Sequence, residues 1–194
     1  MYLHEFKKVA LTARAQELMD ALASRVVIAD GAMGTMLQDQ KPTLQDFEGH
    51  EGCNEVLNAT RPDIVSSVHD AYFEAGVDCV ETNTFGANWS NLSDYGIEDR
   101  IEELARAGAE IARESADRFT AKDGKTRWVL GSMGPGTKLP TLGHTSYDNL
   151  KQTFALQAKG LIAGGSDAFM IETSQDLLQT KAAVNACRLA IVES

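Results

Sequence analysis

Short apolar runs alternate along the chain with longer stretches in which apolar residues recur at every third or fourth position. The short runs predict buried strands, and the longer stretches predict amphipathic helices that cover them. The predicted strands are residues 26–29, 78–82, 128–132 and 168–172. Strands separated by helices lie parallel and are joined by right-handed crossovers. The sequence therefore predicts one α/β domain of about four strand–helix units, either an open doubly wound sheet or half of an eight-stranded barrel.

Capping residues predict the helix boundaries. Thr60 and Pro62 predict the start of a helix that Gly76 ends. The same capping chemistry recurs at residues 145–148 and 173–176, before the helices that flank the fourth strand. The inner face of the last helix is expected to carry Leu177, Val184, Cys187 and Ile191.

A further amphipathic helix is predicted near the N-terminus, at about residues 8–24. Its apolar positions are Leu11, Ala15, Leu18 and Leu22. A signal peptide has an uninterrupted apolar centre, which this segment lacks. Because the longest apolar runs also fall short of the ~20 residues that cross a bilayer, we expect no membrane span.

Composition limits the classes of partner. The 194 residues carry a formal net charge of −10, so the chain lacks the basic footprint expected of a protein that binds nucleic acid or an anionic membrane. The three cysteines form no CxxC pair and do not follow the pattern of a disulfide framework. We therefore expect a reducing, cytoplasmic compartment.

Three acidic residues come at the ends of predicted strands. Asp30 precedes the glycine-rich turn 31–35, and Glu81 and Glu172 end the second and fourth strands. The carboxyl ends of parallel strands meet at one edge of a sheet, where α/β folds bind their ligands. Carboxylates accept hydrogen bonds from an ammonium group, and the free N–H groups of a turn can hold a carboxylate. This arrangement suits a small amino acid.

Each of these acids also has a purely structural interpretation. Asp30 can cap the backbone of its own turn. Glu172 can belong to an ion pair, since an unpaired charge after an apolar strand is costly. Glu81 has polar neighbours that can hold it behind the site. The residues alone leave these alternatives open.

Histidine and cysteine do not suggest a metal site. The histidines show no metal-ligand spacing and are His4, His50, His69 and His144. Only His144 follows the third strand, where a substrate contact is conceivable. Cys53 lies in the long first loop without a paired histidine, which is more typical of an inert thiol than of a nucleophile. Cys79 and Cys187 are expected to pack in the core.

The glycine-rich stretch 131–138 invites comparison with a phosphate-binding loop. A P-loop needs lysine immediately after its second spaced glycine, and here Thr137 precedes Lys138. No Gly-x-Gly-x-x-Gly motif opens a helix after the first strand either. A nucleotide-binding open sheet is therefore the weakest hypothesis.

Several stretches together resemble a known family. They are Asp-Gly-Ala-Met-Gly-Thr-Met-Leu-Gln (30–38), Cys-Asn-Glu-Val-Leu (53–57), Thr-Arg-Pro-Asp-Ile (60–64), Ala-Tyr-Phe-Glu-Ala-Gly (71–76), Glu-Thr-Asn-Thr-Phe-Gly (81–86), Gly-Pro-Gly-Thr-Lys (134–138) and Met-Ile-Glu-Thr (170–173). In this order they resemble the homocysteine-binding domain of the cobalamin-dependent methionine synthases, within the homocysteine S-methyltransferase family.

The resemblance implies a (β/α)8 TIM-type barrel that binds homocysteine at its C-terminal face. The homocysteine thiol would accept a methyl group from methyltetrahydrofolate through cobalamin, and this transfer gives methionine. Asp30 and Glu172 would hold the ammonium group. The N–H groups of the turn at residues 31–35 would hold the carboxylate. The substrate-binding residues implied are Asp30, Gly31, Ala32, Gly34, Thr35, Asn54, Asn83 and Glu172, with Glu81 and Thr173 behind them.

The family also uses a zinc ion, held by three cysteines, to favour the homocysteine thiolate. Those cysteines come from an Asn-Cys after the sixth strand and a Gly-Gly-Cys-Cys after the eighth, and none of the cysteines before Ser194 matches them. We therefore expect no metal ligand here, and expect zinc, cobalamin and the folate- and cobalamin-binding domains to belong to the rest of a parent protein.

On this interpretation residues 1–194 are the N-terminal part of a homocysteine-binding domain, about four units of the barrel, and are inactive alone. They would supply the half of the site that binds the amino and carboxylate groups. The alternative is a non-catalytic half-barrel that dimerises to cover its sheet edges and binds a small amino acid.

Overall fold

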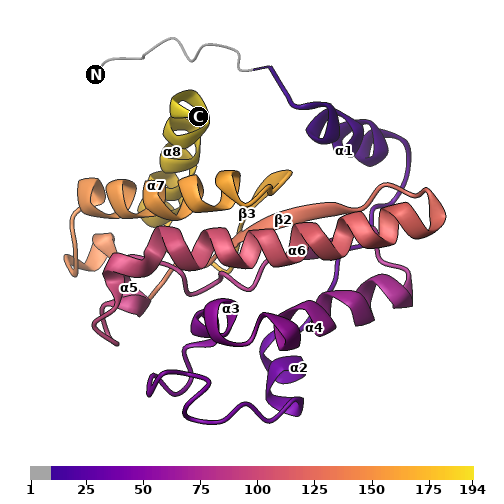
Figure 1. The fold of residues 1–194 in the computed structure, drawn as a ribbon. Helices are drawn as coiled ribbons and strands as arrows, with labels where there is room; N and C mark the ends of the chain where they lie inside the picture. Colours follow the sequence, from indigo (N-terminus) through magenta and orange to yellow (C-terminus); the bar gives the residue numbers. More distant parts are fainter. Residues whose placement is uncertain (1–9) are drawn as a thin grey trace.

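A parallel sheet with helices packed around it forms the centre of the computed structural model, which describes residues 10–194 (Figure 1). The strands lie in the order β1-β2-β3, and each neighbouring pair is parallel. They span Cys79–Glu81 (β1), Trp128–Met133 (β2) and Ala168–Ile171 (β3). The predicted parallel α/β architecture is confirmed, with strand ends within about one residue of those expected.

Helices occupy the connections between the strands. They span Ala13–Ser24 (α1), Gly34–Asp39 (α2), Leu57–Thr60 (α3), Pro62–Ala75 (α4), Trp89–Leu92 (α5), Ile101–Asp123 (α6), Tyr147–Ala163 (α7) and Leu177–Glu193 (α8), with 3-10 turns at Asn54–Val56 (η1), Glu98–Arg100 (η2) and Pro140–Leu142 (η3). α4 packs on α6, α6 on α7 and α7 on α8, so the long helices follow one another around the sheet (Figure 1).

The capping predictions are confirmed for α7, for α8 and for the end of α4, but Thr60 does not cap α4. Arg61 precedes that helix without a side-chain cap, and the Thr60 hydroxyl donates to the carbonyls of Asp46 and Val56. Ser146 accepts a hydrogen bond from the N–H of Asn149 at the start of α7, at 3.1 Å. Asp176 accepts from the backbone at the start of α8. Gly76 ends α4 with φ of 99°, a left-handed conformation that favours glycine. These caps fix where the helices begin and so how the loops at the carboxyl ends of the strands run.

The first predicted strand is wrong in both extent and burial. Within residues 26–29, only Ala29 forms a β-bridge, to Cys79. The side chains of Val26 and Ile28 are 81% and 55% exposed. The segment lies at the edge of the sheet beyond β1, where no second strand covers it within residues 10–194.

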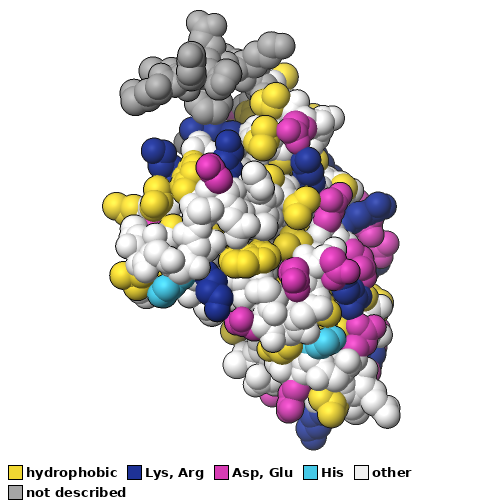
Figure 2. All heavy atoms as spheres, turned by 90° about the vertical axis from the view of Figure 1, so that its left-hand side faces the viewer, with side chains coloured by type: hydrophobic (Ala, Val, Ile, Leu, Met, Phe, Trp, Pro, Cys, Tyr) yellow, Lys and Arg dark blue, Asp and Glu magenta, His cyan; other side chains and the backbone are white. Residues whose placement is uncertain are grey.

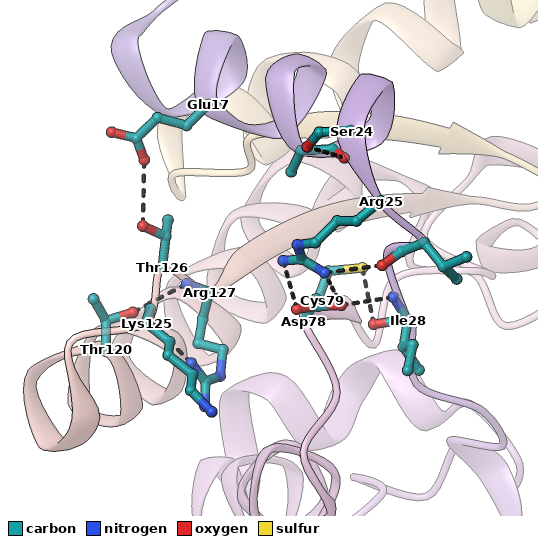
Figure 3. A network of polar contacts seen from close by, with 12 residues as sticks. Glu17, Ser24, Arg25, Ile28, Asp78, Cys79, Thr120, Lys125, Thr126 and Arg127 are labelled. Carbon is teal, nitrogen blue, oxygen red and sulfur yellow. Dashed lines mark hydrogen bonds and ion pairs between the residues drawn. The ribbon is translucent and has the colours of Figure 1, made fainter.

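Polar contacts nevertheless fix this segment to the sheet (Figure 3). The guanidinium of Arg25 donates to both carboxylate oxygens of Asp78, each at 2.8 Å. Oδ2 of Asp78 also accepts the N–H of Ile28 at 2.8 Å. The hydrogen bond from Arg25 holds the pKa of Asp78 below its ordinary value. These contacts set the position from which Asp30 reaches the end of β1.

The fourth predicted strand was expected to be buried, and its burial is corrected as well. Each residue of β3 is half-buried, whereas every residue of β2 is buried. The difference arises because β2 pairs on both sides, while β3 pairs with β2 alone in the described sheet.

The predicted inner face of α8 is also wrong in part. Leu177 and Ile191 are 86% and 39% exposed. The buried face is made instead by small residues such as Ala182 and Ala186, together with Cys187 as predicted. Small side chains let α8 lie close against α7, and this close packing decides which face turns inward.

The N-terminal helix is confirmed as a helix, but its apolar face is wrong at two positions. Leu18 is buried, whereas Leu11 and Leu22 are 56% and 55% exposed. α1 begins at Ala13, and the first two predicted residues lie outside the described part. Its Arg14 donates to Asp167, just before β3, at 3.2 Å. α1 is thereby tied to the amino ends of the strands, away from the acids at their carboxyl ends.

Charged residues of both signs cover the outer flank. In Figure 2 they gather at the right-hand edge. This edge corresponds to the front of the molecule in Figure 1, where α6 lies. Arg106 and Glu110 form an exposed ion pair one turn apart on α6, an arrangement that contributes little to stability. Among the helices described between residues 10 and 194, none has the length and apolar character needed to cross a membrane.

Candidate functional site

Three acidic side chains meet at the carboxyl end of the sheet. Asp30 follows the edge segment, Glu81 ends β1 and Glu172 follows β3. All three line one cavity of about 290 Å³. The other residues around this cavity are Gly31, Met33, Gly34, Asn54, Glu55, Thr82, Asn83, Phe85 and Ser132. The structure therefore brings together the acids that the sequence placed at separate strand ends.

One carboxylate oxygen of Asp30 is satisfied and the other is not. Oδ1 accepts the backbone N–H of Glu81 at 2.9 Å. Oδ2 is buried and has no hydrogen-bond partner within the described chain. Burial raises the pKa of Asp30 to about 7, and the negative charges of Glu81 and Glu172 contribute in the same direction. A buried oxygen without a donor is suited to a ligand that brings one.

Glu172 is held by two hydroxyl groups. Ser132 Oγ, on β2, donates to Glu172 Oε1 at 2.5 Å, and Thr173 Oγ1 lies 3.4 Å from Oε2. Thr173 has φ of 55°, a left-handed conformation that is rare for a β-branched residue. The unusual turn places the Thr173 hydroxyl beside the carboxylate of the preceding residue.

Glu81 lies against Glu172. The pKa of Glu81 is raised to about 7, chiefly by burial and also by the charge of Glu172 and a hydrogen bond with its side chain. Two carboxyl groups this close do not both ionise readily, because like charges repel in a partly desolvated cavity. The pair therefore holds a proton more tightly than an exposed glutamate does.

The glycine-rich turn passes over the cavity mouth. Gly31 and Gly34 line the cavity, while Ala32 and Thr35 are exposed and lie outside its lining. The Tyr72 hydroxyl, on α4, donates to the carbonyl of Ala32 at 3.0 Å and so holds the turn. α2 begins at Gly34, and the first N–H groups of a helix have no partner inside the helix.

The two predicted asparagines both line the cavity, but one of them is occupied by structural contacts. The amide of Asn83 donates to the carbonyl of Asn54 at 2.8 Å and to Oδ1 of Asn58 at 2.9 Å. Asn58 also donates to the carbonyl of Asn83 at 2.8 Å. Asn83 thus joins the loop after β1 to the loop before α3, and Asn58 is a supporting residue that the sequence analysis missed.

Glu55 is another residue that the sequence analysis did not single out. Its Oε1 accepts the N–H of Gly86 at 2.7 Å, and its Oε2 lies 3.6 Å from the thiol of Cys53. A Cβ at position 86 would lie 2.7 Å from Oε1, so only glycine allows this contact. Burial raises the pKa of Glu55. Its place in the 53–57 motif was the available signal, as was that of Met33 in 30–38 and of Phe85 in 81–86, whereas Ser132 lies outside these motifs and carried none.

The cysteines do not form a metal site. Cys53, Cys79 and Cys187 are buried in three different hydrophobic clusters, and burial raises the pKa of each thiol to about 12. Across residues 10–194 no group of three or more His, Cys, Asp and Glu side chains is arranged to hold a metal ion. The residues present therefore do not fit a zinc site.

None of the histidines described in residues 10–194 lines the cavity of the acids. His69 is buried on α4, as expected for a helix residue without a catalytic role. His144 accepts the backbone N–H of Leu139 through Nδ1 at 3.2 Å, which holds its own loop, and it does not line the cavity. His4 lies outside the described residues.

The comparison with protein families decides the classification. A family model described as homocysteine S-methyltransferase matches residues 27–193, which include every acid of the cavity. The chain belongs to this family. The resemblance noted in the sequence motifs is thereby confirmed.

Two mycobacterial relatives of the chain are much longer than the chain itself. It is 57% identical over 178 residues to the methionine synthase of Mycobacterium leprae (strain TN). It is 56% identical over 178 residues to the methionine synthase of Mycobacterium tuberculosis (strain ATCC 25618 / H37Rv). Both alignments cover 92% of this chain but only 15% of the relative, so the chain corresponds to a small part of these proteins.

Solved structures of the family share the fold. The metallated form of the homocysteine methyltransferase MmuM from Escherichia coli superposes with a TM-score of 0.72 at 23% identity, over 87% of this chain and 61% of that one. The oxidized form of the same protein superposes with a TM-score of 0.73 at 22% identity, over 90% of this chain and 61% of that one. At this identity the likeness shows the fold, an α/β fold of TIM-barrel type.

Proposed function

We propose that the chain is the N-terminal part of the homocysteine-binding domain of a longer methyltransferase of the methionine synthase type. The parent enzyme would transfer a methyl group, received from methyltetrahydrofolate through cobalamin, to the thiol of homocysteine. The identity of 57% to a methionine synthase supports this, as does the family match over residues 27–193. The folate- and cobalamin-binding domains would lie in the remainder of the parent protein.

The proposal includes a half-barrel. β1, β2 and β3, with the edge segment before them, would be consecutive strands of a (β/α)8 barrel. Their parallel order and the sequence of helices around them support this assignment. The superposition on MmuM, which leaves more than a third of that chain unmatched, is consistent with it.

The observation that carries the proposal is the convergence of Asp30, Glu81 and Glu172 on one cavity. In the described part of the chain, no lysine or arginine lines this cavity, so its charge favours a cation. Asp30 Oδ2 and the carboxylate of Glu172 would accept from the homocysteine ammonium. The N–H groups of residues 31–35 would hold the carboxylate, just as N–H groups at the starts of helices hold anions in other proteins.

The remaining site residues have supporting roles in this proposal. Asn54 and Asn83 would shape the wall that the substrate backbone contacts, and Asn83 fixes the loop that carries it. Thr173 and Glu81 would hold Glu172 from behind.

Activation of the thiol would not come from this chain. A bound zinc ion lowers the pKa of a coordinating thiol, and the cysteines here are buried apart from one another. The zinc ligands and the cobalamin site would belong to other parts of the parent enzyme. We therefore expect the 194-residue chain to show no methyl transfer on its own.

The test is Asp30→Asn in the complete enzyme. Asparagine keeps an oxygen that can accept the N–H of Glu81 but removes the charge that faces the ammonium. Because a hydrogen bond to a charged group contributes ~1.5–3 kcal/mol, the KM for homocysteine should rise by ~10-fold or more. Asp99→Asn, at an exposed position on η2, is the matched control and should leave KM unchanged. An unchanged KM in Asp30→Asn would contradict the assignment.

A second candidate function follows from the exposed sheet edge. Val26 and Ile28 present apolar side chains there, and edges of this kind attract another strand. Two copies could close one barrel and bind an amino acid without chemistry. A compact dimer of the chain in sedimentation, stable on dilution, would favour this candidate, and a monomer would count against it.

A further inference from the structure

The cavity concentrates negative charge without a compensating cation. Asp30, Glu55, Glu81 and Glu172 all line it, and its lining contains no lysine or arginine within residues 10–194. Such a group of carboxyls in about 290 Å³ cannot all be ionised at low cost. In the absence of a ligand the balance must come from protons.

The hydrogen bonds show which carboxyl carries a proton. Glu81 and Glu172 line the same cavity, and a hydrogen bond between their side chains contributes to the raised pKa of Glu81. Two carboxylates offer only acceptors, so this bond requires one proton between them. Ser132 donates its hydroxyl proton to Glu172 Oε1 at 2.5 Å, so Glu172 acts as an acceptor there. Because Oε1 of Glu172 already accepts from Ser132, the arrangement favours Glu81 as the carboxyl that carries the proton and donates to Glu172.

The neighbouring titratable groups do not replace this proton. Asp30, before β1, points one oxygen at the N–H of Glu81 and adds negative charge. Glu55, on η1, accepts from the N–H of Gly86 and is directed toward Cys53. Cys79, on β1, is neutral near pH 7 because burial raises its pKa to about 12. None of these groups is a cation that could neutralise the pair.

We propose that Glu81 is a positioning residue that shares a proton with Glu172 in the empty site and releases it when a substrate ammonium enters. The inference rests on the proposed function, since it takes the ammonium to bind at this cavity. The ammonium brings one positive charge to the carboxyls, and the proton leaves Glu81 for solvent. Glu81 and Glu172 are then both carboxylates, with Glu172 facing the ammonium and Glu81 behind it. No bond other than the O–H bond of Glu81 is broken.

The raised pKa of Glu81, to about 7, places this exchange near neutral pH. Below that pH the entering ammonium must displace a proton, so binding weakens as pH falls. For one linked proton the affinity changes by about tenfold per pH unit in this range. Asp30 adds a similar dependence of its own, because its pKa is also raised to about 7. A comparison with a variant is therefore needed to isolate Glu81.

The experiment uses the complete enzyme and methionine as the probe. Methionine carries the same ammonium and carboxylate as homocysteine but has no thiol proton, so thiol ionisation cannot contribute. Calorimetric titration at about pH 6 in buffers of different ionisation enthalpy gives the number of protons released. Glu81→Gln keeps an amide that can donate to Glu172 but has no proton to lose. Glu114→Gln, an exposed position on α6, is the matched control.

We expect wild type and Glu114→Gln to release protons, and Glu81→Gln to bind methionine while releasing about one proton fewer. Equal proton release in wild type and Glu81→Gln would overturn the inference, and so would methionine binding to wild type without proton release. Failure of wild type to bind methionine would instead overturn the proposed function. Difference infrared spectroscopy of wild type needs no variant: the carbonyl band of a protonated carboxyl should disappear when methionine binds, and a persistent band would refute the release.

Discussion

Ser132 Oγ donates a 2.5 Å hydrogen bond to Oε1 of Glu172 and so links the middle strand of the sheet to the end of β3. Ser132 is itself buried, with 2% of its surface exposed. In Ser132→Ala the carboxylate of Glu172 loses its strongest fixed donor and gains rotational freedom. We expect the KM for homocysteine in the complete enzyme to rise by ~10-fold, as for loss of one hydrogen bond to a charged group. Steady-state kinetics measures this.

The control for that variant is Ser67→Ala, an exposed serine on α4 whose hydroxyl bonds only within its own helix. It should leave KM unchanged. If Ser132→Ala also left KM unchanged, then Glu172 would be held well enough by Thr173 and Glu81, and Ser132 would have no positioning role.

The sequence predicted the site better than it predicted the packing around it. The convergence of Asp30, Glu81 and Glu172 follows from parallel topology alone, which places strand ends at one edge. Ser132 was missed because a single serine inside an apolar strand gives no periodic signal. The face of α8 was mispredicted because Ala182 and Ala186 are small, and a hydrophobic pattern favours large residues over those that permit close approach.

Burial of the edge segment could not be predicted either. Residues 26–29 have the composition of a core strand, yet only Ala29 pairs. Whether a strand is buried depends on what packs on both of its sides. Its composition indicates only that its side chains would favour burial. The polar contacts of Arg25 and Asp78 join residues 53 positions apart, which no local pattern reveals.

His69 should make the stability of the chain depend on pH. It is fully buried on α4, and both ring nitrogens lack a hydrogen-bond partner within the described residues. Burial lowers its pKa to about 4, while the nearby charges of Asp70 and Arg118 act in opposite directions. At this position the unfolded chain therefore binds the proton more readily, so the contribution of His69 to stability falls by up to ~3 kcal/mol as pH drops from about 6.5 towards 4. Asp30 and Glu81 contribute in the opposite direction, because their pKa values are raised to about 7 in the folded chain.

The measurement is urea unfolding at several pH values in this window. His69→Leu, which cannot be protonated, should gain stability relative to wild type as pH falls through this window, whereas the curve of His50→Gln, in a loop, should stay parallel to that of wild type. Parallel curves for wild type and His69→Leu would contradict the prediction.

Gly160 permits the close contact between α6 and α7. A Cβ at this position would lie 2.5 Å from the carbonyl oxygen of Glu102 and 2.9 Å from the Cβ of Ala105. Gly160→Ala gains ~1 kcal/mol in helix propensity but forces the two helices apart. We expect a net destabilisation of ~1–3 kcal/mol in chemical unfolding. Gln152→Ala, on the exposed face of α7, should change stability by less than ~0.5 kcal/mol, and a stabilised Gly160→Ala would show that the helices can separate freely.

We expect the side chain of Asp78 to contribute more to stability than its ion pair with Arg25 does. Its carboxylate receives Arg25 at 2.8 Å and also the N–H of Ile28 at 2.8 Å, the contact that holds the segment leading to Asp30. Asp78→Ala removes both contacts and leaves a backbone donor unpaired, so we expect a loss of ~1–3 kcal/mol and faster hydrogen exchange at Ile28 and Asp30. Arg25→Ala removes the ion pair, a hydrogen bond to the carbonyl of Val26 and a contact over the Trp128 ring, but it keeps the N–H of Ile28 paired. It should therefore cost less than Asp78→Ala, with slow exchange retained. Equal effects of the two substitutions would mean that the ion pair, rather than the backbone contact, places Asp30 beside Glu81.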